Sequence, residues 1–184
     1  RELGYAIKHL GIARQTENGV ELRVHPTLVP QRSLIAGVND VLNAVMVNAD
    51  AVGTTLFYGP GAGSEPTASS VIADIVDVAR NMDSYPDAWV PALGCKLTAL
   101  KEQPLMGIEE VETGFYIRFS ALDKPGVLSN VTKIMADAGI SIESIIQRDQ
   151  PAGESYVNVI ILTNVTKEKC LDEAVEHIEQ LETV

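Results

Sequence analysis

Hydrophobic and polar residues alternate along the first thirty positions in a way that predicts a β-hairpin. Alternation is imperfect from Tyr5 to Ala13 and clean from Val20 to Val24, as in strands with one buried face. The polar stretch between them ends in Asn18-Gly19, a pair that favours a tight turn. Two prolines in the segment from His25 to Pro30 remove backbone donors, so we expect the second strand to stop there.

The next pattern predicts two further strands and then a helix. Residues 33–37 favour a helical turn, 44–49 and 54–58 favour strands, and the glycine-rich stretch 59–65 is typical of an irregular loop. From residue 67 to 82, apolar residues recur at helical spacing at Val71, Ile72, Ile75, Val76, Ala79 and Met82. Pro66 suits the first turn of this helix, where a missing N–H is tolerated, and we expect Ser64 or Thr67 to cap it.

Composition changes at residue 83, and we place a linker over 83–113. It contains Pro86, Pro91 and Pro104, a single tryptophan, Trp89, and an acidic run at 109–112. Such a stretch is typical of a connector with a short extended piece. The expected division is therefore a first region over 1–82 and a second domain over 114–184.

The second domain has a sharper pattern, which predicts the order β-α-β-β-α. The expected elements are strands at 115–120, 140–146 and 156–163, helices at 127–138 and from Thr166 onward, a turn at 123–126 and a hairpin loop at 150–154. The third strand is nearly all apolar, so we expect it to be central. The predicted class is α+β, with a partial α/β first region on a mixed sheet. The second domain is then ferredoxin-like, with its last strand missing or truncated and one sheet edge open.

Charge and composition narrow the classes of partner. The formal net charge is −11 and 46% of the residues are hydrophobic, which predicts a packed core and excludes nucleic acid and anionic membranes as partners. The two cysteines, Cys95 and Cys170, predict neither a disulfide nor a metal site and fit a reducing cytoplasm. The chain shows no signal peptide and begins with Arg1 instead of Met, so we expect a processed or cut fragment.

The turn from Asp123 to Gly126 is the first candidate for binding chemistry. It links a strand to the start of a helix, where free N–H groups and the helix dipole favour a small carboxylate or zwitterion. Gly126 lets a ligand approach the backbone, Asp123 can hold an ammonium group, and Asn130 lies one helical turn further on. The alternative is an ordinary strand-to-helix turn with Asp123 as the helix cap.

The stretch from Gly59 to Glu65 is the second candidate. It has three glycines in five residues between a strand and a helix, but a dinucleotide fingerprint would need glycine at position 64, which is Ser64, and no Walker lysine follows. Spacing alone leaves nucleotide binding and a tight structural turn both open. His9 and His25 have no Asp or Ser partner at suggestive spacing, and we expect both to be structural.

Residues 122–128, Leu-Asp-Lys-Pro-Gly-Val-Leu, followed by Ala-Gly-Ile-Ser-Ile at 138–142 and the β-α-β-β-α order, resemble the ACT domain. The resemblance covers 65 to 70 residues. It implies a module that binds amino acids or other small molecules at domain interfaces and regulates a metabolic enzyme. The implied regulatory-ligand residues are Asp123, Gly126 and Asn130.

The first region is similar to the end of the catalytic region of the homoserine dehydrogenase family. The similarity rests on Tyr-Gly-Pro-Gly-Ala-Gly at 58–63, Pro-Thr-Ala-Ser at 66–69 and Asp-Ile at 74–75, and on shorter matches at 2–13, 24–29 and 39–45. It implies hydride transfer between NAD(P)H and aspartate semialdehyde, which gives homoserine. Gly61, Ala62 and Gly63 would then present backbone to the nicotinamide end of the cofactor.

The same resemblance implies that the catalytic parts of the enzyme lie outside this chain. The nucleotide fold, two catalytic lysines and the substrate-binding acidic residues are expected upstream, so we predict no catalytic residue here, Lys8 included. The fragment alone is expected to be inactive and without bound cofactor. Its effector would be an amino acid of threonine, methionine and isoleucine biosynthesis, with threonine the first choice, in a cytoplasmic homodimer. The alternatives are a stand-alone ACT-type sensor or interaction module and the tail of another ACT-bearing enzyme, such as phosphoglycerate dehydrogenase or aspartokinase.

Overall fold

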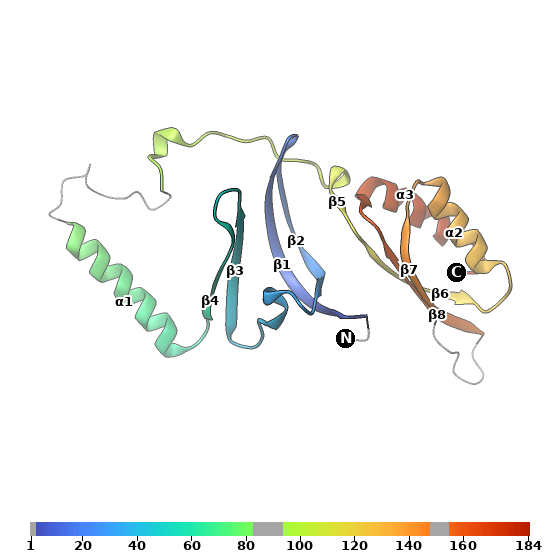
Figure 1. Cartoon of the computed structure of the whole chain (residues 1–184), viewed down its shortest axis with the longest axis horizontal. Helices are drawn as coiled ribbons and strands as arrows, with labels where there is room; N and C mark the ends of the chain where they lie inside the picture. The colour runs from blue at the N-terminus through green and yellow to red at the C-terminus, as the bar shows by residue number, and fades with distance from the viewer. Residues whose placement is uncertain (1–2, 83–93, 148–154) are drawn as a thin grey trace. The chain divides into compact units, whose positions relative to one another are not determined.

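The structure is a computed structural model that describes residues 3–82, 94–147 and 155–184, and its chain divides into two compact units (Figure 1). The first unit comprises residues 1–10 and 25–102, and the second comprises 11–24 and 103–184. Residues 11–24, which form the distal part of the first hairpin, belong to the second unit, although they precede most of the first unit in the sequence. Each unit is described by itself.

The first hairpin is longer than the sequence predicts. Strand β1 (Tyr5–Thr16) pairs with β2 (Gly19–Pro30) in a two-stranded sheet, and the turn at Gly19 has the positive φ of 127° that glycine tolerates. The expected stop at His25 is wrong, because β2 continues to Pro30. Each strand of a two-stranded ribbon has an edge outside the ladder, so a proline without an N–H can be accommodated there.

A second hairpin and a helix follow in the first unit, as expected. The 3₁₀ turn η1 (Leu34–Gly37) precedes the antiparallel strands β3 (Leu42–Ala49) and β4 (Gly53–Pro60), and helix α1 (Ser64–Asn81) follows. The expected seven-residue loop shortens to 61–63, because its two ends join β4 and α1.

The start of α1 corrects a predicted cap. Gly63 is the N-cap, without a side-chain hydrogen bond, and its carbonyl accepts the N–H of Thr67 at 3.2 Å. The predicted caps, Ser64 and Thr67, both lie inside the helix. Pro66 is the third helical residue, and it fits because the first four N–H groups of a helix have no intrahelical acceptor.

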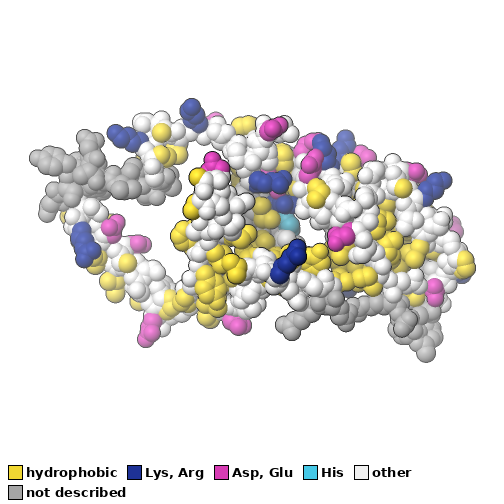
Figure 2. Space-filling view, in the orientation of Figure 1, with side chains coloured by type: hydrophobic (Ala, Val, Ile, Leu, Met, Phe, Trp, Pro, Cys, Tyr) yellow, Lys and Arg dark blue, Asp and Glu magenta, His cyan; other side chains and the backbone are white. Residues whose placement is uncertain are grey.

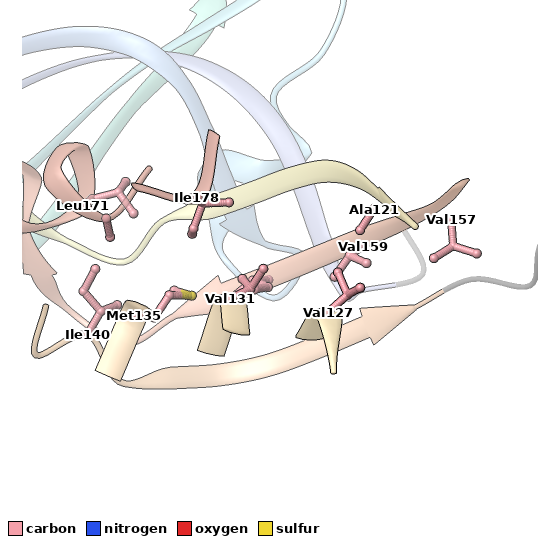
Figure 3. Close-up of a cluster of buried hydrophobic side chains, with 11 residues drawn as sticks. Ala121, Val127, Val131, Met135, Ile140, Val157, Val159, Leu171 and Ile178 are labelled. Atoms are coloured by element: carbon pink, nitrogen blue, oxygen red, sulfur yellow. The ribbon is translucent and has the colours of Figure 1, made fainter. Parts of the chain in front are cut away.

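The second unit is built on a three-stranded antiparallel sheet. Its strands are β6 (Tyr116–Leu122), β7 (Ile142–Gln147) and β8 (Tyr156–Thr163), in the order β6-β8-β7, which confirms the predicted central strand. Helices α2 (Val127–Asp137) and α3 (Glu168–Glu179) supply the other half of the core. Val131 and Met135 of α2 and Val159 and Ile161 of β8 are fully buried in this core (Figure 3). The expected hairpin loop at 150–154 lies outside the described residues.

Two details at the ends of this sheet correct the prediction. Thr166 does not cap α3: it belongs to β9 (Thr166–Lys167), which pairs with β5 (Glu112–Thr113), and Lys167 is the N-cap. The N–H of Leu122, at the end of β6, donates to the carbonyl of Thr183 at 2.9 Å. The C-terminal residues therefore begin to cover the strand edge that the sequence predicts to be open, where a ferredoxin-like fold has its fourth strand.

The described part of the expected linker divides between the two units: residues 94–102 belong to the first unit and residues 103–113 to the second. The 3₁₀ turns η3 (Leu97–Ala99) and η4 (Ile108–Glu110) precede β5, and Val111 is only 2% exposed, with its carbonyl accepting the N–H of Glu168 at 2.9 Å. Lys167 Nζ lies 2.5 Å from Glu110 Oε2. Their hydrogen bond and opposite charges lower the pKa of Glu110 and raise the pKa of Lys167. Pro86, Trp89 and Pro91 lie outside the described residues.

The first unit exposes much of its apolar surface. Helix α1 has no buried residue in the part of the chain that the structure describes, and Ile75 on its apolar face is 61% exposed. Phe57 of β4 is 63% exposed. Hydrophobic side chains gather over β3, β4 and α1 (Figure 2). Even so, no helix of the described segments is long and apolar enough to cross a membrane.

Candidate functional site

The turn before α2 has an open backbone start. The N–H of Asp123 donates to the carbonyl of Ser155 at 3.2 Å, and Gly126 is the N-cap of α2 with φ 94° and no side-chain cap hydrogen bond. Asp123 is therefore not the helix cap, which removes the bland interpretation of this residue. The N–H of Val127 donates to the Lys124 carbonyl at 3.3 Å, whereas the N–H groups of Leu128 and Ser129 have no acceptor one turn earlier, so these two can donate to an anionic group.

A small cavity lies at this turn. Its volume is about 180 Å³, and Asp123, Lys124 and Gly126 line it together with apolar side chains from β6, α2 and β8, namely Ala121, Leu122, Val127, Leu128, Val157 and Val159. Pockets for drug-sized ligands are usually about 300 to 1,000 Å³. This cavity suits a smaller molecule that combines charged groups with a short apolar part, such as an amino acid.

Gln147 is a lining residue that the sequence analysis missed. It ends β7, and its Nε2 donates to Asp123 Oδ1 at 3.3 Å, which orients the carboxylate. A polar residue at the end of an alternating strand is a weak signal, because Gln147 pairs with Val159 and only the tertiary fold brings its side chain within reach of Asp123. Asn130 is exposed and is not among the residues that line the cavity, although its N–H donates to the Gly126 carbonyl at 3.0 Å.

The glycine loop at 61–63 is held by backbone and side-chain contacts inside the first unit. The N–H of Gly61 donates to the carbonyl of Val41 at 3.1 Å. A Cβ atom on Gly61 would lie 2.2 Å from Nδ2 of Asn43, and Gly63 has φ 128°. Gly63 therefore requires glycine for its backbone conformation, and a side chain at Gly61 would have to displace the Asn43 amide. Ala62 lies between the two glycines, and all three residues are exposed.

The chemistry of this loop suits a neutral ring better than a phosphate. Pro66 removes one N–H from the first turn of α1, and Glu65 adds a carboxylate there. A negative charge at a helix start competes with an anionic ligand for the same donors. The exposed backbone of 61–63 can still contact a flat, uncharged group, as a nicotinamide is in its reduced form.

The remaining candidates of the sequence analysis are separate from these two sites. His25 lies in β2 and hydrogen-bonds to the next residue, with its Nδ1 2.9 Å from the Pro26 carbonyl. Cys95 and Cys170 are both free. Within 3–82, 94–147 and 155–184, no three or more His, Cys, Asp or Glu side chains are grouped so that they could hold a metal ion.

The fold of the second unit defines its class. A three-stranded antiparallel sheet packed with two helices in the order β-α-β-β-α is ferredoxin-like, and a small cavity lies at its first strand-to-helix turn. The family model for the ACT domain matches residues 115–183, so this unit contains an ACT domain.

A second family is found in the first region. The family model for homoserine dehydrogenase matches residues 1–76, so the first region carries a segment of the homoserine dehydrogenase family, and the ACT domain follows it. This result favours the resemblance found for 58–75 over the tail of another ACT-bearing enzyme, which would leave the first region unexplained.

Individual relatives agree with this assignment. Homoserine dehydrogenase of Pseudomonas aeruginosa is 53% identical over 182 residues, which cover 99% of this chain and 42% of that protein. The crystal structure of a homoserine dehydrogenase from Thiobacillus denitrificans matches all of this chain and 41% of that one, with a TM-score of 0.88 and 51% identity. For Staphylococcus aureus homoserine dehydrogenase at pH 6.0 the TM-score is 0.57 with 27% identity. The chain spans about two fifths of the length of these relatives.

Proposed function

We propose that this chain is the C-terminal part of a homoserine dehydrogenase, in which the ACT domain binds an amino acid that regulates the enzyme. The full-length protein would interconvert aspartate semialdehyde and homoserine with NAD(P), in the cytoplasm, for threonine, methionine and isoleucine biosynthesis. The observation that carries the regulatory part is the cavity of about 180 Å³ at the Asp123–Gly126 turn.

Threonine is the effector that we propose first. Its ammonium group can pair with the Asp123 carboxylate, which Gln147 already orients. Its carboxylate suits the N–H groups at the start of α2, where the helix dipole favours negative charge. The apolar lining, with Val127 and Val157, can accept the methyl group. Asn130 stays part of the proposal as a residue on the adjacent turn of α2.

Calorimetric titration of L-threonine into this chain tests the effector. We expect saturable heat in the wild type and a loss of at least about tenfold in affinity for Asp123→Asn, because a charge-assisted hydrogen bond is removed. Asp137→Asn, at the exposed end of α2, is the matched control and should bind as the wild type does. Absence of heat at millimolar threonine contradicts this choice of effector, and a parallel titration of methionine and isoleucine tests its closest alternatives.

The second part of the proposal concerns the cofactor. When bound to the full-length enzyme, the nicotinamide cofactor supplies or accepts the hydride. The residues of this chain would position it: Gly61, Ala62 and Gly63 present backbone without side-chain bulk. We place no catalytic residue in the chain and expect the chain alone to be inactive.

A substitution in the full-length enzyme tests the cofactor loop. Gly63→Val introduces a branched side chain at φ 128° and ψ 153°, a backbone conformation that costs a non-glycine residue about 1 to 3 kcal/mol. We expect the Kd for NADPH, measured by fluorescence, to rise by at least about tenfold. Gly59→Ala is the control, because a Cβ there meets nothing within 4 Å. Unchanged NADPH binding in Gly63→Val would exclude the loop from the cofactor site.

We also propose that the protein is a homodimer. The support is the exposed apolar surface over β3, β4 and α1, which is larger than scattered surface residues would produce. Sedimentation velocity at micromolar concentration should give the mass of two full-length chains. A single monomeric species would contradict the proposal.

A further inference from the structure

Lys8 makes long-range contacts that no role assigned so far explains. It lies in β1, away from the glycine loop in sequence, and its Nζ donates to the carbonyl of Val38 and to Oδ1 of Asn39, the latter at 2.7 Å. A lysine ammonium group has three donors and no acceptor, so it can hold two oxygens at once. The side chain thereby ties the segment at 38–39 to strand β1.

The segment that Lys8 holds has an unusual backbone. Asp40 is a non-glycine residue with φ 56°, a conformation that persists when surrounding contacts hold it in place. Asn39 supplies two of these contacts: its Nδ2 donates to the Gly37 carbonyl at 3.1 Å, and its own carbonyl accepts the N–H of Leu42 at 3.1 Å. The Lys8 contacts therefore lie at the centre of a tightly determined turn.

This turn is connected directly to the glycine loop. Val41, the residue after Asp40, accepts the N–H of Gly61 at 3.1 Å and the Nδ2 of Asn43 at 3.3 Å. The same Asn43 amide occupies the space next to Gly61 where a side chain would clash. The position of the Val41 carbonyl thus fixes both the hydrogen bond and the packing of Gly61, and the turn at 37–41 fixes that carbonyl.

We propose that Lys8 is a positioning residue for the Gly61–Gly63 loop. It acts through the turn at 37–41: its ammonium group holds Val38 and Asn39, and this turn presents Val41 to Gly61. The functional consequence, more favourable cofactor binding, rests on the proposed function of the loop. The structural consequence, order at Gly61, does not.

Hydrogen–deuterium exchange on the full-length protein without cofactor tests the structural consequence. In Lys8→Met the amide of Gly61 should exchange at least about tenfold faster, because a loss of hydrogen bonds from a charged donor loosens its acceptor segment. Exchange at Val159, in the core of the ACT domain, should stay within twofold, roughly the precision expected for an independent region. Lys101→Met, an exposed lysine of the same unit, controls for loss of charge. Lys8→Arg keeps a long cationic donor and should restore most of the protection.

Cofactor binding then tests the functional consequence. We expect the Kd of Lys8→Met for NADPH to rise about tenfold, with the KM for aspartate semialdehyde changed by less than about twofold, since only the cofactor loop is displaced. Lys8→Gln, which retains a donor, should lie between Lys8→Met and the wild type.

The outcomes separate this inference from the proposal on which it rests. Unchanged exchange at Gly61 in Lys8→Met, or a uniform rise that includes Val159, would overturn the positioning role. Faster exchange at Gly61 with unchanged NADPH affinity in both Lys8→Met and Gly63→Val supports the positioning role and rejects the cofactor role of the loop. Faster exchange together with weaker NADPH binding supports both.

Discussion

Helices α1 and α2 carry the same kind of apolar stripe, yet only α2 has an apolar core beneath it. Val131 and Met135 of α2 are fully buried against β8, whereas Ile75 of α1 is 61% exposed. The comparison shows that a 3.6-residue period identifies the face of a helix that favours burial. It does not show which part of the molecule buries that face.

The same contrast separates the two units as wholes. The buried cluster around Met135, Val159 and Ile161 lies entirely within residues 121–178, so the ACT domain closes its own core. The strands β3 and β4 and the helix α1 of the first unit expose large apolar side chains. An exposed apolar surface of that kind is typical of an interface, and relatives of this chain are more than twice as long.

The largest expected difference in stability is between two substitutions, one at a buried position of α2 and one at an exposed position of α1. Met135→Ala should lower the free energy of unfolding of the ACT domain by about 2 to 5 kcal/mol, because it leaves a cavity in a closed core. Ile75→Ala should change the unfolding free energy of the same chain by no more than about 0.5 kcal/mol, since its side chain is mostly in water. Urea denaturation of this chain followed by circular dichroism measures both. A cost for Ile75→Ala equal to that of Met135→Ala would mean that α1 is buried in solution by a partner.

The next largest expected loss of stability comes from replacing a buried carboxylate in the first hairpin. Glu21 of β2 is 1% exposed, its Oε2 lies 2.6 Å from Arg14, and its Oε1 lies 2.7 Å from Arg23 Nε. The Arg23 contact is out of line for a hydrogen bond, so it is electrostatic. Glu21→Gln should cost about 3 kcal/mol, the lower end of the range for a broken buried pair, because Arg14 is half exposed and can rehydrate while Arg23 stays mostly buried.

The neighbours of Glu21 explain why residues 11–24 group with the second unit. The N–H of Val20 donates to the Pro104 carbonyl at 2.8 Å, and the N–H of Met106 donates to the Val20 carbonyl at 3.0 Å. Urea denaturation of Glu21→Gln should therefore show a loss of stability in the transition that reports the ACT domain. Glu17→Gln, at an exposed position in the turn of the same hairpin, is the control. Equal stability of the two variants would show that the pair contributes nothing.

The smallest expected effect concerns the ion pair of Glu110 and Lys167, at the surface of the second unit. Lys167 lowers the pKa of Glu110, so the stabilising contribution of this carboxylate is present above its unfolded pKa and is lost as the pH falls through its folded pKa. The pKa of Lys167 is raised, so its stabilising contribution is lost as the pH rises through its folded pKa in the alkaline range. Both side chains are exposed, so salt and water screen the pair.

A comparison of melting temperatures measures this pair. Glu110→Gln should lower the Tm by no more than about 2 °C at pH 7, and the difference from the wild type should disappear at pH 2 to 3 and shrink in 1 M salt. A difference that persists at pH 2 would show that the effect of the substitution comes from packing and not from charge.

The elements that the sequence predicted best are those with strong local patterns. The period of α2, with Gly139 at its end, and the apolar run of β8 gave a helix and a central strand within a few residues of the observed bounds. The predictions failed at residues that are compatible with two local structures, because tertiary contacts then decide between them. Thr166 could cap a helix or extend a strand, and pairing with Thr113 favours the strand. Pro26 could end β2, but an edge position tolerates it.

In the candidate sites too, local features were predicted from the sequence and long-range contacts were not. The glycine loop at Gly61 and Gly63 and the turn at Gly126 were visible in the sequence, because short motifs of small residues express local backbone needs. The partnership of Gln147 with Asp123 and the tie between Lys8 and Asn39 were not. Each of these pairs joins residues more than twenty positions apart, and only the tertiary fold brings them within hydrogen-bonding distance.

By itself, the amino-acid order determined the periodic elements, the two glycine-dependent turns and the two families to which the segments are similar, because these depend on neighbours along the chain. The tertiary structure alone decided which apolar faces are covered, which polar side chains meet at the cavity and where the first hairpin packs. Those outcomes depend on contacts between residues far apart in the sequence, and which of these contacts form is decided only when the whole molecule packs.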